Sequence, residues 1–391
     1  MQAVLNQPGT GPLASRAPGP QGINMEGAMA LAEEMIVFKG VSKSYGRSVA
    51  LRPTDLAVRK GEFLSLLGPS GSGKSTILNI IAGAIAPSSG QVLLDGRDVS
   101  SVPPRERQLG MVFQNYALLP HLNVYENVAF PLKIRGVGAA EIRQRVGNAL
   151  ERVGLVGYEK RKPREMSGGQ QQRVGIARCI VYSPSVILMD EPLGALDKKL
   201  RDQLQGEIKR LHKDLGTTLV YVTHDQEEAL NLSDRVCLMN GGRIAQLGTP
   251  DELYFEPHDE FVADFVGESN LFPGIVLDRD TVQVDGGWNL AVRSTAGFAM
   301  GERVKVMVRP EKILAAVGGD AAPRGDNRCQ GAVSQVSFVG GMTRYEIALA
   351  DGKTLLVKGI SDRASERSAS GCSMAMSWSA RDSVVIKQKQ A

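Results

Sequence analysis

GPSGSGKST, residues 68–76, fits the phosphate-loop pattern G-x-x-x-x-G-K-[ST] and decides the fold. The stretch before it, Glu62–Leu67 (EFLSLL), is short and apolar, which predicts a buried strand, and Thr76–Gly83 after it predicts a helix. Glycines allow successive backbone N–H groups to turn toward a phosphate, and the helix dipole adds positive potential behind them. Strand, glycine loop and helix together predict an α/β fold with a phosphate-binding site.

Different residues of this loop are expected to bind different parts of a nucleotide and its metal ion. Lys74 is expected to neutralise the β- and γ-phosphates, and the Ser75 hydroxyl is expected to coordinate Mg²⁺. A Gly/Ser-rich turn could match the pattern by chance, but the flanking strand and helix argue against this alternative. The predicted phosphate contacts are Gly68, Pro69, Ser70, Gly71, Ser72, Gly73, Lys74, Ser75 and Thr76.

Length and composition limit the class of protein. A chain of 391 residues is long enough for two or three domains, and its net charge of +4 gives no strong attraction to nucleic acid, so no nucleic-acid partner is expected. Four widely spaced cysteines favour reduced thiols over a disulfide framework or a zinc site. The longest apolar run, residues 77–86, is too short to cross a bilayer. Residues 1–34 are rich in Pro, Gly and Ala, which predicts a disordered extension.

Polar residues end three further predicted strands, over residues 110–115, 185–192 and 218–224. These residues are Gln114, the adjacent acids Asp190 and Glu191, and His224. Strand ends converge at one edge of an open α/β sheet, where Asp190 suits Mg²⁺, Glu191 suits an attacking water, and Gln114 suits either. Each residue also has a structural alternative without a ligand. Gln114 could be a solvent-facing amide, and His224 could be a surface or packed imidazole. Asp190 and Glu191 could be a helix cap and a solvated acid.

Two other candidates are weaker alone. Tyr45 lies on a turn and could stack on a nucleotide base, although packing on the sheet is the better interpretation without the phosphate loop. Met166–Arg173 opens a helix that extends through Ile180, with Ser167 in a natural N-cap position and two glycines at an anion-binding terminus. The alternative is a capped helix with no ligand. Residues 117–156 between these features predict a helical insertion.

Taken together, these segments resemble the nucleotide-binding subunit of an ATP-binding cassette (ABC) transporter, in the expected order. The resemblance implies that Tyr45 stacks on adenine, that residues 68–76 are the Walker A loop, and that Asp190 with Glu191 completes Walker B. It implies that Gln114 is the Q-loop residue and that His224 is the switch histidine. The signature motif, which reads MSGGQ here rather than LSGGQ, would comprise Ser167, Gly168, Gly169 and Gln170. Asp197 would belong to the D-loop, in which Gly194 replaces a common Ser.

The resemblance also implies a domain organisation. It places an ABC ATPase cassette at 35–268, with a helical subdomain at about 115–170, and a C-terminal OB-like, TOBE-type β-barrel domain at 269–391. Short β-like runs separated by turn residues support the β domain. Residues 315–328 and 361–371 are predicted to be exposed loops. The signature helix of this family contacts the ATP of a second cassette, which implies a head-to-tail homodimer that binds ATP and Mg²⁺.

The function implied is ATP hydrolysis that powers solute import through two permease subunits, which receive solute from an external binding protein. The subunit would lie peripherally on the cytoplasmic face of the inner membrane. Residues 114–128 and 340–345 look most like the spermidine/putrescine group, with ferric-iron, sulfate and sugar importers as alternatives. A soluble ABC ATPase acting on ribosomes or DNA usually has tandem cassettes or coiled-coil insertions, which this chain lacks. Intact Lys74, Asp190, Glu191 and His224 argue against a degenerate cassette.

Overall fold

The computed structural model describes residues 33–194, 196–317, 325–361 and 371–388. The predicted disordered extension at the N-terminus therefore lies almost wholly outside the described residues. By its internal contacts the chain divides into Met1–Glu33 and Glu34–Ala391, and the account below concerns the second unit. Within the described residues, no helix is both long enough and apolar enough to cross a membrane.

The central layer is a six-stranded sheet with the order β10-β9-β3-β8-β7-β6. All neighbouring pairs are parallel except β10 with β9, which are antiparallel. Every side chain of β3 and β8 is buried, as expected for strands covered on both faces. The strands are β3 (Phe63–Leu67), β6 (Gly110–Val112), β7 (Val186–Asp190), β8 (Thr218–Val222), β9 (Arg235–Asn240) and β10 (Arg243–Gly248).

A four-stranded antiparallel sheet, ordered β2-β1-β4-β5, packs against the first helix. The strands are β1 (Glu34–Tyr45), β2 (Ser48–Arg59), β4 (Ser89–Leu94) and β5 (Arg97–Asp98), and the helix is α1 (Lys74–Ala82). Asp95 and Gly96 join β4 to β5 with φ values of 47° and 75°, the conformation that a two-residue hairpin turn requires. An Asp-Gly pair is a strong sequence signal for such a turn.

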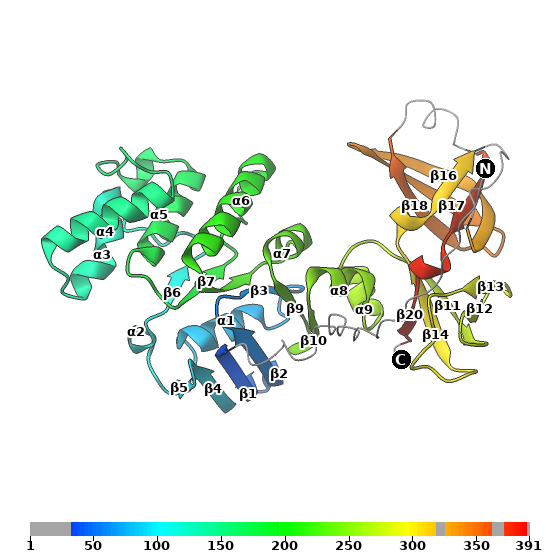
Figure 1. Cartoon of the computed structure of the whole chain (residues 1–391), viewed down its shortest axis with the longest axis horizontal. Coiled ribbons are helices and arrows are strands. Elements are labelled where there is room, and N and C mark those ends of the chain that lie inside the picture. Colours follow the sequence, from blue (N-terminus) through cyan, green and yellow to red (C-terminus); the bar gives the residue numbers. More distant parts are fainter. Residues whose placement is uncertain (1–32, 195, 318–324, 362–370, 389–391) are drawn as a thin grey trace, which may run out of the picture. The chain divides into compact units, whose positions relative to one another are not determined.

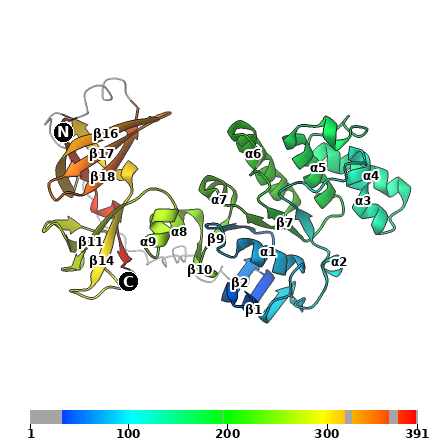
Figure 2. The same cartoon turned by 180° about the vertical axis from the view of Figure 1, so that it is seen from behind.

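Helices form the rest of the cassette. Figures 1 and 2 both show α3, α4 and α5 gathered together beyond the β6 edge of the central sheet. The predicted helical insertion is confirmed, and its buried residues share one core with the helices around it. The helices are α2 (Pro104–Arg107), α3 (Val124–Ile134), α4 (Ala139–Arg152), α5 (Gly168–Ile180), α6 (Lys198–Leu215) and α7 (Gln226–Leu232).

The C-terminal part consists of two five-stranded antiparallel sheets, β13-β12-β11-β14-β20 and β15-β19-β16-β17-β18. They enclose a core in which Trp378 stacks on Phe272 at 6.2 Å and meets Trp288 edge-on. The strands are β11 (Asn270–Val276), β12 (Thr281–Val284), β13 (Asn289–Ala291), β14 (Arg303–Val308), β15 (Leu314–Val317), β16 (Asn327–Val339), β17 (Met342–Leu349), β18 (Thr354–Ile360), β19 (Ser373–Trp378) and β20 (Ser383–Lys387).

The all-β prediction for this part is confirmed, but one predicted loop is wrong in part. Residues 315–317 belong to β15 and residues 327–328 to β16, because both strands pair with β19. Residues 318–324 of that loop, and residues 362–370 of the second predicted loop over 361–371, lie outside the described residues.

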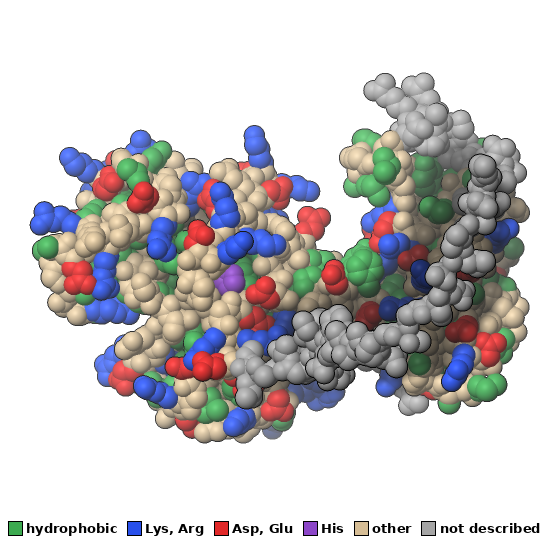
Figure 3. Space-filling model, viewed as in Figure 1, with side chains coloured by type: hydrophobic (Ala, Val, Ile, Leu, Met, Phe, Trp, Pro, Cys, Tyr) green, Lys and Arg blue, Asp and Glu red, His purple; other side chains and the backbone are tan. Residues whose placement is uncertain are grey.

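A buried arginine joins the last cassette helices, α8 (Pro250–Phe255) and α9 (Glu260–Phe265), to the β domain. The Arg309 guanidinium, beyond the end of β14, donates to the carbonyl oxygens of Tyr254, Ala263 and Glu268 and stacks over the Tyr254 ring at 4.1 Å. Exposed ion pairs connect the same parts, including Glu256 with Arg293. Lys and Arg side chains are interspersed with Asp and Glu on the visible surface (Figure 3).

Candidate functional site

The phosphate loop follows β3 and leads directly into α1, which begins at Lys74. Gly68 has φ 145°, and a Cβ at this position would lie 2.3 Å from the Met239 carbonyl oxygen. Gly73 has φ 106°, and a Cβ there would lie 2.9 Å from the Ala50 carbonyl oxygen. Both contacts are with rigid backbone, so these two positions accept only glycine. The sequence prediction of strand, loop and helix is confirmed.

Two groups inside the loop are prepared for an anion. Lys74 is buried, and its ammonium donates to the carbonyl oxygens of Gly68 at 2.7 Å and Pro69 at 2.9 Å. Burial lowers the pKa of Lys74, while the neighbouring charges of Glu191 and Asp190 oppose this shift. The Ser72 hydroxyl is buried without a hydrogen-bond partner. A phosphate would partner both groups, so the loop fits the ligand that its sequence predicts.

The strand ends bring three candidate catalytic residues together. Glu191 directly follows β7, has φ 42°, and donates its backbone N–H to the Val222 carbonyl oxygen at the end of β8. Its carboxylate Oε2 lies 3.3 Å from His224 Nδ1. A Cβ built on Gly194 would lie 3.9 Å from both Gln114 Nε2 and Glu191 Oε2, so the amide and the carboxylate both lie beside Gly194. A non-glycine residue at positive φ is strained, and such strain is concentrated at functional sites.

The predicted strand ending at Gln114 is too long. Strand β6 ends at Val112, because the Tyr116 backbone N–H donates to the Phe113 carbonyl oxygen and closes a turn at this point. Gln114 therefore lies on an exposed loop rather than on the strand, yet it still reaches the carboxylate edge.

The donor set at this edge suits a hard cation. Burial raises the pKa of the Asp190 carboxyl, the charge of Glu191 adds to this, and Lys74 opposes it. A divalent cation would offset the cost of keeping this carboxylate ionised. The hydroxyl of Ser75, the amide oxygen of Gln114 and the Asp190 carboxylate are all oxygen ligands of the kind Mg²⁺ prefers. The residues thus fit the predicted ion.

Other candidates lie elsewhere on the chain. Ser167 caps α5, and Ser167 and Gln170 exchange hydrogen bonds in a capping box, so the predicted N-cap is confirmed. Among the described residues, no hydrogen bond joins this signature segment to the phosphate loop of the same chain. Asp197 caps α6 through the Leu200 backbone N–H. Tyr45 ends β1, and its ring is half exposed, with Lys43 Nζ 5.0 Å from the ring centre.

A clamp beside Gln114 was not foreseen from the sequence. Tyr116 and Ala117 are consecutive non-glycine residues with φ values of 60° and 45°. Arg178 on α5 donates to both of their carbonyl oxygens, at 2.9 Å and 2.7 Å. Only the tertiary structure shows this contact, because the residues are about sixty positions apart.

Comparison with known proteins agrees with this geometry. Residues 51–194 match the family model described as ABC transporter, and residues 306–386 match the TOBE domain. The Spermidine/putrescine import ATP-binding protein PotA of Rubrobacter xylanophilus is 45% identical over 359 residues, which cover 90% of this chain and 94% of the relative. The chain belongs to the ABC transporter family. It is an ATP-binding subunit with ATPase activity coupled to transport.

Further relatives and solved structures support the same family. PotA of Acetivibrio thermocellus is 50% identical over 319 residues, covering 81% of this chain and 88% of the relative. The dimeric cassette MJ0796, in a post-hydrolysis state bound to ADP and Pi, is 36% identical with a TM-score of 0.51, covering 55% of this chain and 99% of that chain. CbiO1 of Clostridium perfringens is 30% identical with a TM-score of 0.54, covering 57% and 92%. The family assignment confirms the predicted cassette followed by a TOBE-type domain.

Proposed function

We propose that this chain is the ATPase subunit of a polyamine importer, and that ATP hydrolysis on it drives uptake of spermidine or putrescine. The substrate class is supported by curated relatives, 44–51% identical, that are named spermidine/putrescine import proteins. Importers of ferric iron, sulfate or sugar remain the alternative substrate classes. We also propose that the cassette ends near residue 268, between α9 and β11, which is where the chain enters the β sheets.

In the proposed mechanism, Lys74 and the backbone of residues 68–76 bind the β- and γ-phosphates, and Tyr45 stacks on the adenine. Glu191 orients the attacking water and accepts its proton, while His224 holds the Glu191 carboxylate and contacts the transferred phosphoryl group. The observation that carries this proposal is the 3.3 Å contact between His224 Nδ1 and Glu191 Oε2 at the ends of adjacent strands. Mg²⁺, held by Ser75, Gln114 and Asp190, would supply charge neutralisation of the phosphates.

A second copy of the chain is proposed to complete the site. Ser167, Gly168 and Gln170 lie at the start of α5 and are solvent-accessible, so this helix start can face a ligand outside this chain. The dimeric cassette MJ0796, to which this chain is similar, supports a two-chain arrangement. In such a pair Asp197 would lie near the interface, where it caps α6.

The permease subunits are proposed to dock on an apolar groove beside the Q-loop. The groove has a volume of about 420 Å³ and lies between β6, α3 and α5. Its rim exposes Phe113, Phe130 and Ile134, the last to 70%, which is unusual for apolar side chains of this size. Docking there would hold the subunit peripherally on the cytoplasmic face of the inner membrane, with solute delivered by an external binding protein.

Two experiments test the proposal. The Glu191→Gln variant is expected to bind ATP and accumulate closed dimers while turnover falls by about 100-fold or more, because only the water-activating carboxylate is lost. Normal turnover in this variant would remove Glu191 from its proposed role as the residue that activates water.

In the second experiment, the full chain reconstituted with its permease subunits should show ATPase stimulation by a polyamine-loaded binding protein. Stimulation only by an iron-, sulfate- or sugar-loaded protein would replace the substrate class and keep the mechanism.

A further inference from the structure

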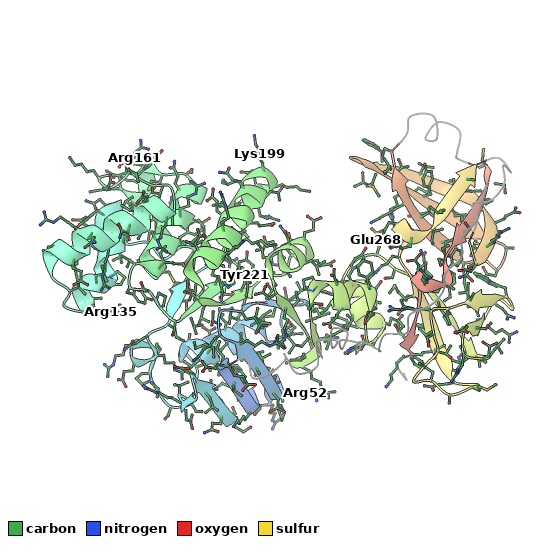
Figure 4. All side chains as sticks on the ribbon, in the orientation of Figure 1. Arg52, Arg135, Arg161, Lys199, Tyr221 and Glu268 are labelled. Atoms are coloured by element: carbon green, nitrogen blue, oxygen red, sulfur yellow. The ribbon has the colours of Figure 1, made fainter. Side chains whose placement is uncertain are left out.

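A buried carboxylate supports the strand end that carries His224. Glu228, on α7, is 3% exposed, and its Oε2 accepts hydrogen bonds from Tyr221 Oη at 2.9 Å and Thr223 Oγ1 at 2.8 Å. Tyr221, labelled in Figure 4, belongs to β8, and Thr223 directly precedes His224. Burial raises the pKa of Glu228, whereas the two hydroxyl donors lower it. A carboxylate at this depth needs a cation nearby to remain ionised.

That cation is Arg201, from the second turn of α6. Its Nη1 donates to Asp225 Oδ2 at 3.0 Å, and its Nη2 donates to the Leu196 carbonyl oxygen at 3.2 Å. Its Nε is buried without a hydrogen-bond partner and lies 3.8 Å from Glu228 Oε1. One guanidinium therefore contacts the segment before Asp197, the residue after His224, and the buried carboxylate below them.

Asp225 connects Arg201 to the backbone around His224 through hydrogen bonds. Its Oδ1 accepts from the backbone N–H groups of Glu227 and Glu228 and caps α7, while its own N–H donates to Thr223 Oγ1 at 3.0 Å. The residues on both sides of His224 are thus fixed by the same network. The imidazole itself is largely exposed and contacts Glu191. Its position consequently depends on how its backbone neighbours are held.

We propose that Arg201 is a positioning residue for ATP hydrolysis: it ties the Leu196–Asp197 segment to the His224 loop, with Glu228 as its buried counter-charge. Arg201 and His224 line the same cavity, but among the described residues neither Arg201 nor Glu228 makes a hydrogen bond or ion pair with the phosphate loop or with Glu191, so both act through His224. This inference rests on the proposed roles of His224 and Glu191. The forked contact makes the position of His224 depend on the position of Leu196, so a movement of one segment displaces the other.

The geometry requires an arginine rather than a positive charge alone. A planar guanidinium presents donors in a fixed fork, and here two of its nitrogens serve acceptors on different segments. A lysine ammonium is a compact charge that could neutralise Glu228 and Asp225 but would not span both segments. The Arg201→Lys variant therefore keeps the positive charge but removes the contact that spans both segments, so it tests positioning apart from charge neutralisation.

The test measures ATPase activity of the full chain assembled with its permease subunits. Arg201→Met is expected to lower kcat by ~10- to 100-fold, the effect of a displacement of about 1 Å at a reacting centre. The KM for ATP should stay within about twofold, because the phosphate loop is untouched. Arg210→Met is the matched control, since Arg210 lies on the exposed side of the same helix and donates to the Gly206 carbonyl oxygen within α6. This control should retain normal turnover.

A double variant shows whether Arg201 acts through His224. Adding Arg201→Met to His224→Ala should lower kcat by less than about twofold further, because coupled residues are not additive. Independent, multiplicative losses would overturn the proposal, as would full activity of Arg201→Lys or normal kcat in folded Arg201→Met. If Arg201→Met does not fold, the Glu228→Gln variant is measured in its place. Its amide would face Arg201 Nε without a negative charge, so it should give the same selective loss of kcat. An unchanged kcat in Glu228→Gln would again overturn the proposal. Full turnover of His224→Ala alone would instead refute the proposed function.

Discussion

Arg178→Met is expected to release the turn that follows Gln114. In the native chain, Tyr116 and Ala117 hold left-handed backbone conformations that cost about 1–2 kcal/mol per non-glycine residue, or about 2–4 kcal/mol together. The two hydrogen bonds from Arg178 join a charged donor to neutral carbonyl oxygens, at 2.7 Å and 2.9 Å. Since one of these bonds is exposed to solvent, we take the low value of about 1.5 kcal/mol each, which gives about 3 kcal/mol.

The hydrogen bonds from Arg178 and the backbone strain are thus of similar size, so without Arg178 the strain of the turn is no longer offset by these two bonds. Removing about 3 kcal/mol from a local opening equilibrium should accelerate hydrogen exchange at the Tyr116 and Ala117 amides by ~100-fold, since tenfold corresponds to about 1.4 kcal/mol. Exchange in β3 and β8, which lie in the buried sheet, should be unchanged. Hydrogen exchange of the full chain, measured residue by residue, gives both quantities.

Arg135→Met is the control for this measurement. Arg135, at the end of α3 and labelled in Figure 4, lines the same groove but stacks over the Tyr182 ring at 4.0 Å. It makes no hydrogen bond to Tyr116 or Ala117 among the described residues. If Arg178→Met leaves exchange at these two amides unchanged, or if Arg135→Met accelerates it equally, the clamp does not hold the turn and the reasoning is refuted.

Two further predictions concern buried side chains. Trp378→Ala should lower the free energy of unfolding of the β domain by about 3–5 kcal/mol, because it removes a 1%-exposed indole that stacks on Phe272 and donates to Ser383 Oγ. Thermal or urea unfolding measures this change, and a loss below about 1 kcal/mol would contradict the prediction. Burial raises the pKa of Cys179 and Cys237 to about 12, so at pH 8 both stay protonated in the folded chain and become reactive only as pH rises toward that value or on unfolding. Mass spectrometry after iodoacetamide treatment should therefore find them labelled more slowly than the less buried Cys372, and equal rates would show that they are accessible.

Local pattern was enough for the features whose cause is local. The phosphate loop needs backbone conformations that only glycine adopts without strain, and Gly68 and Gly73 reveal this need directly in the sequence. The Ser167 cap and the Asp95–Gly96 turn are similar, since each depends on side chains within three residues. Strand ends that converge at one sheet edge follow from topology, which explains why Glu191 and His224 were expected together.

Contacts between distant segments were not predictable in this way. Arg178, Arg201 and Glu228 resemble ordinary charged residues on helices, and only the folded chain shows which carbonyls and carboxylates they meet. The predicted loop over residues 315–328 was wrong at its two ends for a related reason: its Ala-rich beginning has weak strand propensity, and pairing of both ends with β19 overrides that preference. The strand predicted through Gln114 failed because a turn hydrogen bond at Phe113 ends it early.

The acceptors around Arg309 have a consequence for how the chain tolerates mutation. Three of them are main-chain carbonyl oxygens, of Tyr254, Ala263 and Glu268, which every amino acid supplies. Replacing those residues leaves the three carbonyl acceptors in place, although a change at Tyr254 would remove the ring over which the guanidinium stacks. Only Arg309 itself is chemically irreplaceable there, since its guanidinium must reach several carbonyls at once. The contacts of Arg309 with these carbonyls thus depend on one side chain and on backbone shape, whereas the ion pairs between the same parts, such as Glu256 with Arg293, depend on a particular side chain at each end.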